Sequence, residues 1–469
     1  MCSPELPKKP IREEQPVLQR VRTSIFPQDF QKPQEPGHFR YVFNTLLFHF
    51  RPRKVQERTL AFTLTFGLGG MAVVLVGMLF VTGILLKFIY QPVPDRAYES
   101  ILHLQTTVPF GRLIRNIHHW SANILMLVAF LHFLRVFFTG AFHPPRQFNW
   151  IIGLTLLLMV LTSNLTGYLL PWDQLSFWAI TICTAMLEYI PGIGSWLQAL
   201  VRGGSDIGPA TLSIFFALHT AVIPACLVLL LSFHFWRIRK AGGLVVPRSP
   251  EEQPGAGSKT VPSIPNLLVR ELTVAAVLIA VIMVLSVLFD APLAAKANSG
   301  LSPNPTKAPW YFAGLQELLL HFHPLFALFV IPICTVIGLV SIPYIRCRTQ
   351  TSGVWFISGQ GRRMAVAAAL FACVATPASV VADELFIDLE AWMPGVSPVV
   401  TIGFFPVLML VSGLVLFSWA LKKMFDASGP ESMQSLFVLL LTAFVLLTVT
   451  GIWFRGEGMA LMWPWDMAG

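Results

Sequence analysis

The chain contains 469 residues, of which 55% are hydrophobic and only 12% are charged. A soluble protein carries roughly twice this charged fraction, so the composition excludes an ordinary soluble enzyme. The net charge of +9 is spread over many segments, and nothing in the sequence is typical of nucleic-acid binding.

About nine apolar stretches are long enough to cross a hydrocarbon core, which takes roughly 20 residues. They predict an all-α polytopic membrane protein. The stretches lie at residues 60–90, 114–139, 149–170, 210–237, 267–290, 322–345, 363–382, 399–421 and 434–454.

The segments between these spans divide the chain. Residues 1–58 are polar, Pro-rich and basic without a signal-peptide pattern, which predicts a cytoplasmic tail. Residues 175–201 are expected to form surface helices, broken at residues 191–194. The predicted units that follow the tail are a four-helix module (59–240), a Pro/Gly/Ser-rich linker (241–265), a second module (266–345) and additional transmembrane helices without an assigned role (346–469).

Two of the predicted spans each carry a pair of histidines. His118 and His132 are 14 residues apart, and His219 and His234 are 15 residues apart. At about 100° and 1.5 Å per residue, each pair lies roughly on one helix face with its members about 21 Å apart, the second pair offset by about 60°. Two such helices can clamp two stacked macrocycles, and imidazole is a common axial ligand of haem iron. The alternative is hydrogen-bonding core histidines, and His119 points to the opposite face from His132.

Glycines repeat this period in two other spans. Gly69 and Gly83 are 14 residues apart in the first span, and so are Gly153 and Gly167 in the third. A glycine facing each histidine level would let a planar group approach the backbone closely. Ordinary packing of small residues between membrane helices is the alternative.

Two arginines flank the histidines of the second span. Arg115 lies three residues before His118, and Arg135 lies three residues after His132. A charge inside a span is costly and indicates a partner, for which haem propionates are suitable. Snorkelling of the side chains to the membrane interface is the competing interpretation.

The loop charges predict the topology. Lys and Arg gather in alternate loops, whereas most Asp and Glu lie in the opposite ones. Basic loops are cytoplasmic, so the N-terminus is expected inside, with His118 and His219 near the outer face and His132 and His234 near the inner face. The six cysteines form no CxxC or CxxCH motif, so no covalently attached haem, iron–sulfur cluster or zinc is expected in this chain.

Together these features resemble cytochrome b of the quinol:cytochrome c (bc) and quinol:plastocyanin (bf) oxidoreductases. The resemblance covers residues 55–345 and rests on the histidine pairs and three motifs. The motifs are RLIRNIHHW at 112–120, GYLLPWDQ at 167–174 and PWY at 309–311. The 15-residue pair and HFWRIRK at 234–240 are closer to the chloroplast-type branch, in which the two modules are separate chains. Residues 383–469 lie outside the family pattern.

The resemblance implies two b haems and a quinol-oxidising function. Quinol would be oxidised near the outer face, with one electron passing to a Rieske iron–sulfur protein and on to a cytochrome c. The other would cross through the outer and inner haems to a quinone near the inner face, with protons released outside and taken up inside. A homodimeric complex in the lipid of a bacterial inner membrane is expected, and menaquinol is the favoured quinol.

The resemblance also assigns residues. His118 and His219 would ligate the outer haem, and His132 and His234 the inner one. Other residues would line the quinone sites. These are Tyr168, Trp172 and Tyr311 at the outer site, with an aromatic interfacial belt as the alternative, and Arg239 with the weaker candidate Glu271 at the inner site.

Two positions depart from the family pattern. The carboxylate that normally precedes Trp-Tyr is replaced by Pro309, which cannot accept a proton. Glu317 is the predicted substitute, with Asp173 and Glu188 as rivals, and a solvated loop carboxylate is the alternative for each. Gly67 stands where the chloroplast-type branch attaches a third haem through cysteine, so a thioether-bound third haem is not expected; a non-covalent one stays open.

Two other functions were considered. A dihaem membrane anchor for a peripheral dehydrogenase would also use histidine pairs, but it would not need the PWDQ and PWY motifs. A haem-free transporter would place polar residues at mid-membrane in broken helices, whereas these histidines lie near the helix ends.

Overall fold

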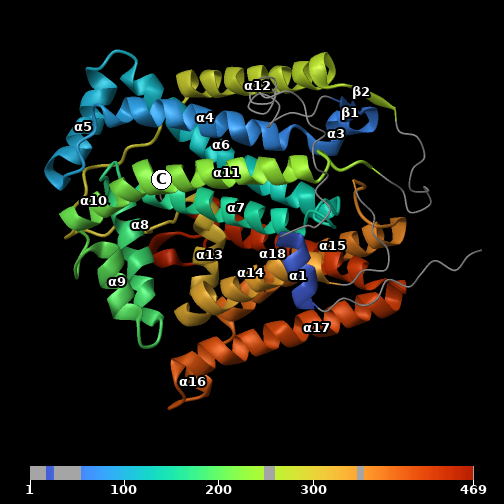
Figure 1. Cartoon of the computed structure of the whole chain (residues 1–469). Helices are drawn as coiled ribbons and strands as arrows, with labels where there is room; N and C mark the ends of the chain where they lie inside the picture. Colours follow the sequence, from blue (N-terminus) through green and yellow to red (C-terminus); the bar gives the residue numbers. More distant parts are fainter. Residues whose placement is uncertain (1–16, 26–53, 248–258, 346–352, 468–469) are drawn as a thin grey trace, which may run out of the picture.

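The computed structural model describes residues 17–25, 54–247, 259–345 and 353–467 (Figure 1). Within these residues, nine helical segments are long and apolar enough to cross a membrane, as predicted. They are α4 (Leu68–Lys87), α6 (Gly111–Phe138), α7 (Gln147–Tyr168), α10 to α11 (Pro209–Lys240), α12 (Ser263–Leu288), the α14 segment (Phe326–Tyr344), α15 (Gly359–Leu385), the α17 segment (Val399–Phe425) and α18 (Gly429–Trp453). The all-α polytopic membrane fold is therefore confirmed.

Shorter elements lie at the two ends of the long helices (Figure 1). At one end, called here the α9 end, are α5, α9 and α16; at the other, the ribbon end, β1 pairs antiparallel with β2. The short elements are α1 (Val17–Ile25), β1 (Lys54–Gln56), α3 (Phe62–Thr65), α5 (Pro94–Thr106), α8 (Gln174–Ala185), α9 (Gly194–Arg202), β2 (Thr260–Pro262), α13 (Trp310–His321) and α16 (Leu389–Trp392).

The boundaries differ from the predictions in several places. The first predicted span, 60–90, is broken because Phe66 and Gly67 both adopt left-handed backbone conformations, with φ of 50° and 68°. Helices α5 and α13 occupy segments that were read as loops, and α1 lies inside the predicted tail. The predicted break between the surface helices is confirmed, since α8 ends at Ala185 and α9 begins at Gly194. Parts of the tail (1–58) and of the linker (241–265) lie outside the described residues.

Three of the long segments contain a π-helical turn that ends two residues before a proline. The turns are Leu218–Val222, Phe326–Val330 and Val399–Phe404, and the prolines are Pro224, Pro332 and Pro406. Proline lacks an N–H and its ring clashes with the carbonyl four residues earlier. The residue before each proline therefore donates one residue further back, which adds a residue to that turn.

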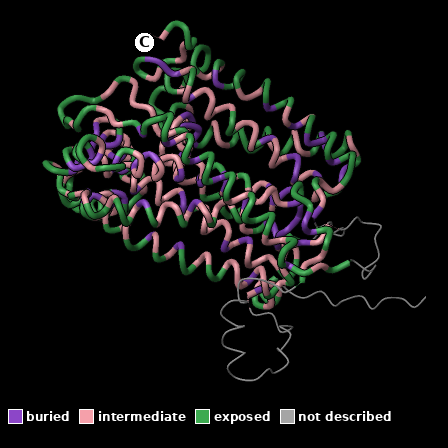
Figure 2. Tube along the Cα trace, turned by 90° about the horizontal axis from the view of Figure 1, so that it is seen from above, coloured by how far each residue is buried: buried purple, intermediate pink, exposed green. Residues whose placement is uncertain are grey.

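The interior and the surface fit a membrane protein. A central cluster of buried apolar residues joins α4, α6, α7, α11 and α12, and Figure 2 shows exposed residues along the long helices at the margin of the molecule. On α12 and α17 these exposed residues are aliphatic, for example Val281, Val287 and Val415. Side chains of this kind are suited to lipid contact.

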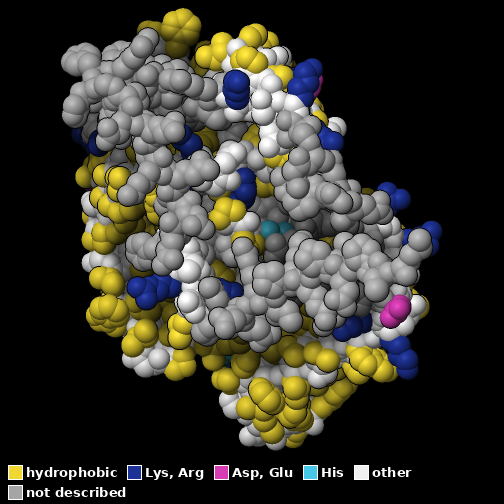
Figure 3. Space-filling model, turned by 45° about the vertical axis from the view of Figure 1, so that its right-hand side comes forward, with side chains coloured by type: hydrophobic (Ala, Val, Ile, Leu, Met, Phe, Trp, Pro, Cys, Tyr) yellow, Lys and Arg dark blue, Asp and Glu magenta, His cyan; other side chains and the backbone are white. Residues whose placement is uncertain are grey.

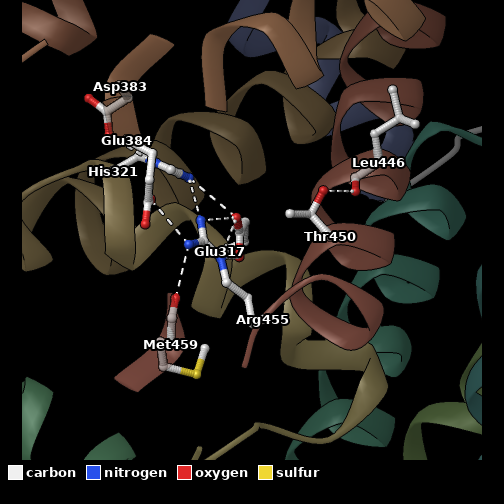
Figure 4. A network of polar contacts seen from close by, with 8 residues as sticks. All are labelled: Glu317, His321, Asp383, Glu384, Leu446, Thr450, Arg455 and Met459. Atoms are coloured by element: carbon white, nitrogen blue, oxygen red, sulfur yellow. Dashed lines mark hydrogen bonds and ion pairs between the residues drawn. The ribbon is translucent and has the colours of Figure 1, made fainter. Parts of the chain in front are cut away.

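A buried ion-pair network joins three helices at the α9 end (Figure 4). Arg455, which follows α18 and is only 1% exposed, donates to both carboxylate oxygens of Glu317 on α13, with distances of 2.6–3.1 Å. Its other nitrogen donates to the Glu384 carboxylate on α15 and to the Met459 carbonyl. Three acceptor groups thus hold one guanidinium between separate parts of the chain, which favours a fixed geometry.

His321 extends this network from Glu317 to Asp383. Its Nε2 lies 3.3 Å from Glu317 Oε1 and its Nδ1 lies 2.7 Å from Asp383 Oδ2. Burial alone would lower the pKa of His321, but the bonds to Asp383 and Glu317 outweigh it and raise the pKa to about 9. Burial alone would raise the pKa of Glu317, but hydrogen bonds from His321 and Arg455 lower it. The histidine is therefore held as imidazolium between two carboxylates.

This assignment predicts a loss of stability at alkaline pH. Because the pKa of His321 is raised above its ordinary value of 6.5, its contribution is complete below pH 6.5 and is lost as the pH rises through 9. The melting temperature of the purified protein between pH 6 and pH 10 measures this. His321→Gln should flatten the decline, whereas His323→Gln should preserve it; an identical decline in His321→Gln would contradict the assignment.

Candidate functional site

At the α9 end, two histidines face each other between four helices. The imidazole rings of His118 on α6 and His219 have centroids 6.2 Å apart and planes inclined by 71°. A Cβ atom on Gly83 would lie 3.3 Å from His118 Cε1, and one on Gly167 would lie 2.5 Å from His219 Cε1. Glycine at these positions on α4 and α7 leaves the space in which the rings stand.

The ribbon end repeats the arrangement with the other four predicted residues. A Cβ atom on Gly69 would lie 3.4 Å from His132 Cε1, and one on Gly153 would lie 3.7 Å from His234 Cε1. Each predicted glycine therefore lies beside the predicted histidine of its own level. At both ends of the bundle, a helix that carries two glycines packs against a helix that carries two histidines, with each glycine opposite one histidine.

The π-turn at Leu218–Val222 explains the unequal histidine spacing. It begins beside His219 and accommodates one extra residue in the turn. The 15 residues from His219 to His234 therefore cover about the same number of turns as the 14 residues from His118 to His132. The offset of about 60° expected for an uninterrupted α-helix is compensated, and both histidines lie beside glycines that are 14 residues apart.

The hydrogen bonds at the α9 end fix the ring nitrogens. Thr82 Oγ1 donates to the Met78 carbonyl at 2.7 Å, so it accepts from His118 Nδ1 at 2.9 Å. His219 Nδ1 donates to the Ser163 carbonyl at 3.0 Å. In both rings Nδ1 carries the proton, and Nε2 keeps a lone pair for a metal. The sequence reasoning did not single out Thr82 or Ser163.

A fully apolar layer separates the two histidine levels. Leu75, Leu125, Val160 and Leu227 come from the four helices that carry the glycines and histidines, and each is at most 6% exposed. Each lies midway along its helix between the two members of a glycine or histidine pair. The two levels are therefore distinct sites with a low-dielectric layer between them.

The predicted arginine sites differ in their partners. Arg115 donates to the carbonyls of Ala291 and Pro292, at 2.7 and 2.6 Å, and so holds the loop that follows α12. Arg135 donates to the Leu64 carbonyl, but its second terminal nitrogen is buried without a partner among the described residues. Arg239 also has a buried terminal nitrogen of this kind. Two guanidinium N–H groups at the ribbon end therefore lack an acceptor within the described chain.

The predicted aromatic residues lie at the α9 end. Tyr311, at the start of α13, packs on the central apolar cluster and has Tyr168 as an electrostatic neighbour. Burial raises the pKa of Tyr311, so its phenol stays protonated at neutral pH. Trp172 is 6% exposed and belongs to a second cluster beneath α8. The structure brings Tyr168 and Tyr311 together.

The two predicted catalytic carboxylates already have partners. Asp173 caps α8, accepting from the backbone N–H of Ser176 at 2.9 Å and of Ala294 at 3.0 Å. Glu317 is 0% exposed and paired with Arg455. The hydrogen bonds from His321 and Arg455 lower the pKa of Glu317, which makes it a poor proton acceptor. The oxygens of Asp173 are engaged in capping α8 and in holding the Ala294 N–H. The geometry therefore gives both carboxylates a structural role. Glu188 is exposed.

The residues of the two levels fit a planar iron-containing macrocycle. Glycines leave room beside each imidazole, and the Nε2 atoms at the α9 end are available to ligate iron. At the ribbon end, the guanidinium N–H groups that lack an acceptor among the described residues can donate to carboxylates. The residues that the sequence missed are the two hydrogen-bond acceptors of the histidines and Arg455. A single arginine directly after an apolar span was the available signal for Arg455.

Sequence comparison links residues 55–242 to the family described as cytochrome b/b6/petB. Cytochrome b6 of Acaryochloris marina (strain MBIC 11017) is 43% identical over 175 residues, which are 37% of this chain and 81% of that protein. Cytochrome b6 of Synechococcus sp. (strain CC9605) is 42% identical over the same length and 80% of that protein.

A solved structure described as hyperthermophilic respiratory Complex III has the same fold. It superposes with a TM-score of 0.59 at 21% identity, covering 88% of this chain and 96% of that one. The matches to the two cytochrome b6 proteins cover 81% and 80% of their lengths. The four histidines and four glycines of the two levels lie within residues 55–242, the range of the family match. The chain therefore belongs to the cytochrome b/b6 family.

Proposed function

We propose that this chain is the cytochrome b subunit of a quinol:cytochrome c oxidoreductase, and that it holds two b haems. The observation that carries the proposal is the pair of matched levels, each with two histidines facing two glycines at one end of the bundle. The first level is at the α9 end, as are Tyr168, Trp172 and Tyr311, and the second is at the ribbon end, as are Arg135 and Arg239.

The chain's own residues set the properties of each haem site. His118 and His219 supply iron ligands at the α9 end, and His132 and His234 supply them at the ribbon end. Haem iron between two imidazoles accepts and donates single electrons. Thr82 and the Ser163 carbonyl orient the first pair of rings and make their Nε2 atoms better donors.

The α9 end would bind quinol. Tyr168, Trp172 and Tyr311 present buried aromatic surface there, and Tyr311 keeps its proton for hydrogen bonding. At the ribbon end, the free N–H groups of Arg135 and Arg239 would bind a quinone oxygen or a propionate. Quinol oxidation at one end and quinone reduction at the other would release and take up protons on opposite sides of the membrane.

The charge distribution supports an orientation. Figure 3, turned so that the ribbon end comes forward, shows more Lys and Arg than Asp and Glu side chains among the residues that the structure describes. Basic ends of membrane helices are cytoplasmic, so we place this end inside and the α9 end outside a bacterial inner membrane. A Rieske protein and a cytochrome c would then meet the α9 end, and the complex would be a homodimer.

The four-helix module (59–240) would carry both haems, and residues 266–345 would complete the outer site through α13. The aromatic motifs at the α9 end favour this function over that of a dihaem membrane anchor, which needs no such surface.

Activity of the whole complex tests this proposal. Membranes containing the complex should reduce cytochrome c with menaquinol or ubiquinol analogues, with separate rates that identify the preferred quinol. Full haem content without any quinol-dependent reduction would instead favour the anchor function.

Replacement of single histidines should separate the two haem sites. His118→Ala removes one ligand at the α9 end and should abolish one b-type component of the reduced-minus-oxidised spectrum, whereas His132→Ala should abolish the other. His119→Ala is the matched control, because His119 lies next to His118 but bonds Asn123. Loss of both components, or of neither, in the two ligand variants would contradict the assignment.

The glycine register gives a second, graded expectation. Gly167→Ala would place a methyl group 2.5 Å from His219 Cε1, so the haem of the α9 end should be lost or its midpoint potential shifted. Gly153→Ala, at 3.7 Å from His234, should have a much smaller effect, and Gly70→Ala, with nothing within 4 Å, should have none. Potentiometric titration measures all three. Equal effects at the three positions would show that the register does not matter.

A further inference from the structure

The last turn of α18 and the residues that follow it contact the segment that carries the PWY motif. We call residues 451–459 the C-terminal clamp. They belong to residues 346–469, whose sequence predicts transmembrane helices without an assigned role. The segment they contact runs from Asn304 to the first turns of α13.

Two hydrogen bonds attach the clamp to the loop before the motif. Lys307 Nζ donates to the Ile452 carbonyl at 2.9 Å, and the Gly458 N–H donates to Asn304 Oδ1 at 2.6 Å. Both bonds lie within a few residues of Trp310 and Tyr311 in the sequence. Backbone groups of the clamp thus hold two side chains of the loop that precedes the motif.

Helix α13 itself is held by charge and by close packing. Arg455 of the clamp makes a two-oxygen contact with Glu317 inside the protein, where neither side chain is more than 1% exposed. A Cβ atom on Gly314 would lie 2.6 Å from Thr448 Oγ1, and one on Gly451 would lie 2.9 Å from the Ala313 carbonyl. The two helices are too close for α13 to slide or rotate without a clash.

The other face of α13 reaches the haem-binding module. Trp310 Nε1 donates to Asn123 Oδ1 on α6 at 2.8 Å, and Tyr311 packs on the central cluster near Tyr168. Helix α13 therefore lies between α6 and α7 on one side and α18 on the other. Whatever fixes α13 against α18 also fixes where the two aromatic rings lie.

We infer that the C-terminal clamp is a positioning element of the quinol-oxidising site, acting through α13 on Trp310 and Tyr311. This inference rests on the proposed function and assigns α18 to the site. The contacts of the clamp run to the loop before the motif and to α13. They set the geometry of Trp310 and Tyr311, and a displacement of about 1 Å at such a site costs on the order of a hundredfold in rate.

The experiment compares variants in the intact membrane complex by quinol titration, visible spectrum and melting temperature. Lys307→Met removes one anchor, and Lys307→Arg keeps a donor for the Ile452 carbonyl. Glu317→Gln combined with Arg455→Met removes the buried ion pair as a whole, so that neither of its two charges is left buried without the other. Glu384 loses its contact with Arg455 in this variant, but its side chain is 29% exposed to solvent. Glu431→Gln is the matched control, because Glu431 joins α15 to the other end of α18 through Ser358 and Ser428.

Lys307→Met and the double variant should lower kcat/KM for quinol by roughly tenfold or more, with unchanged b-haem spectra, and Lys307→Arg should restore most of the activity. Glu431→Gln should lower the melting temperature but keep kcat/KM within about twofold of the wild type. If the wild-type complex is active and the clamp variants also keep kcat/KM within about twofold of it, the inference about the clamp is overturned and the proposed function stands. A wild-type complex that binds haem but oxidises no quinol would overturn the proposed function.

Discussion

The close approach of glycine to histidine between neighbouring helices is the constraint on which the rest of the structure depends. It occurs four times, twice at each end of the bundle, and it fixes α4 against α6 and α7 against α11. One helix in each contact lacks a side chain where the other presents an imidazole, so neither can shift by a residue. The π-turn beside His219 keeps the second pair in this register despite its extra residue.

The interior of the bundle has an apolar middle and charged ends. Between the levels lies a purely aliphatic layer, whereas the buried charges lie beyond them, near the ends of the helices. Arg115 and Arg455 are satisfied by carbonyls and carboxylates of other segments. Arg135 and Arg239 each keep an N–H group without an acceptor among the described residues. Arginines tie distant segments together at both ends, since Arg237 at the ribbon end donates to the carbonyls of Ser24 and Ile25. What distinguishes the ribbon end is the hydrogen-bonding capacity that Arg135 and Arg239 retain there, because a buried polar group without a partner is costly.

The features that could be predicted from the sequence are those that depend on the residues of a single helix. Nine apolar spans, the histidine pairs and the glycine pairs all follow from residues within one helix, because helical geometry alone places them on a face. Each glycine could be matched with a histidine on one further assumption, namely that residues with the same spacing lie at the same two depths in the bundle.

The features that the sequence did not predict depend on contacts between distant segments. The partner of Glu317 is Arg455, 138 residues later, and no local pattern connects them. For the same reason the sequence predicts Glu317 as the substitute proton acceptor, with Asp173 as a rival, whereas Glu317 is paired with Arg455 and Asp173 caps a helix. The break at Phe66–Gly67 was not predicted, because the stretch from Leu60 to Lys87 is apolar enough as a whole to be one span and a single glycine does not end such a stretch.

The central claim is that one chain holds two b haems at two separate levels. A pyridine haemochrome count on the purified wild-type protein, combined with a potentiometric titration of its visible spectrum, tests this most directly. The account predicts two haems per chain and two resolved midpoint potentials. A well-folded preparation that contains one haem, or none, would contradict it.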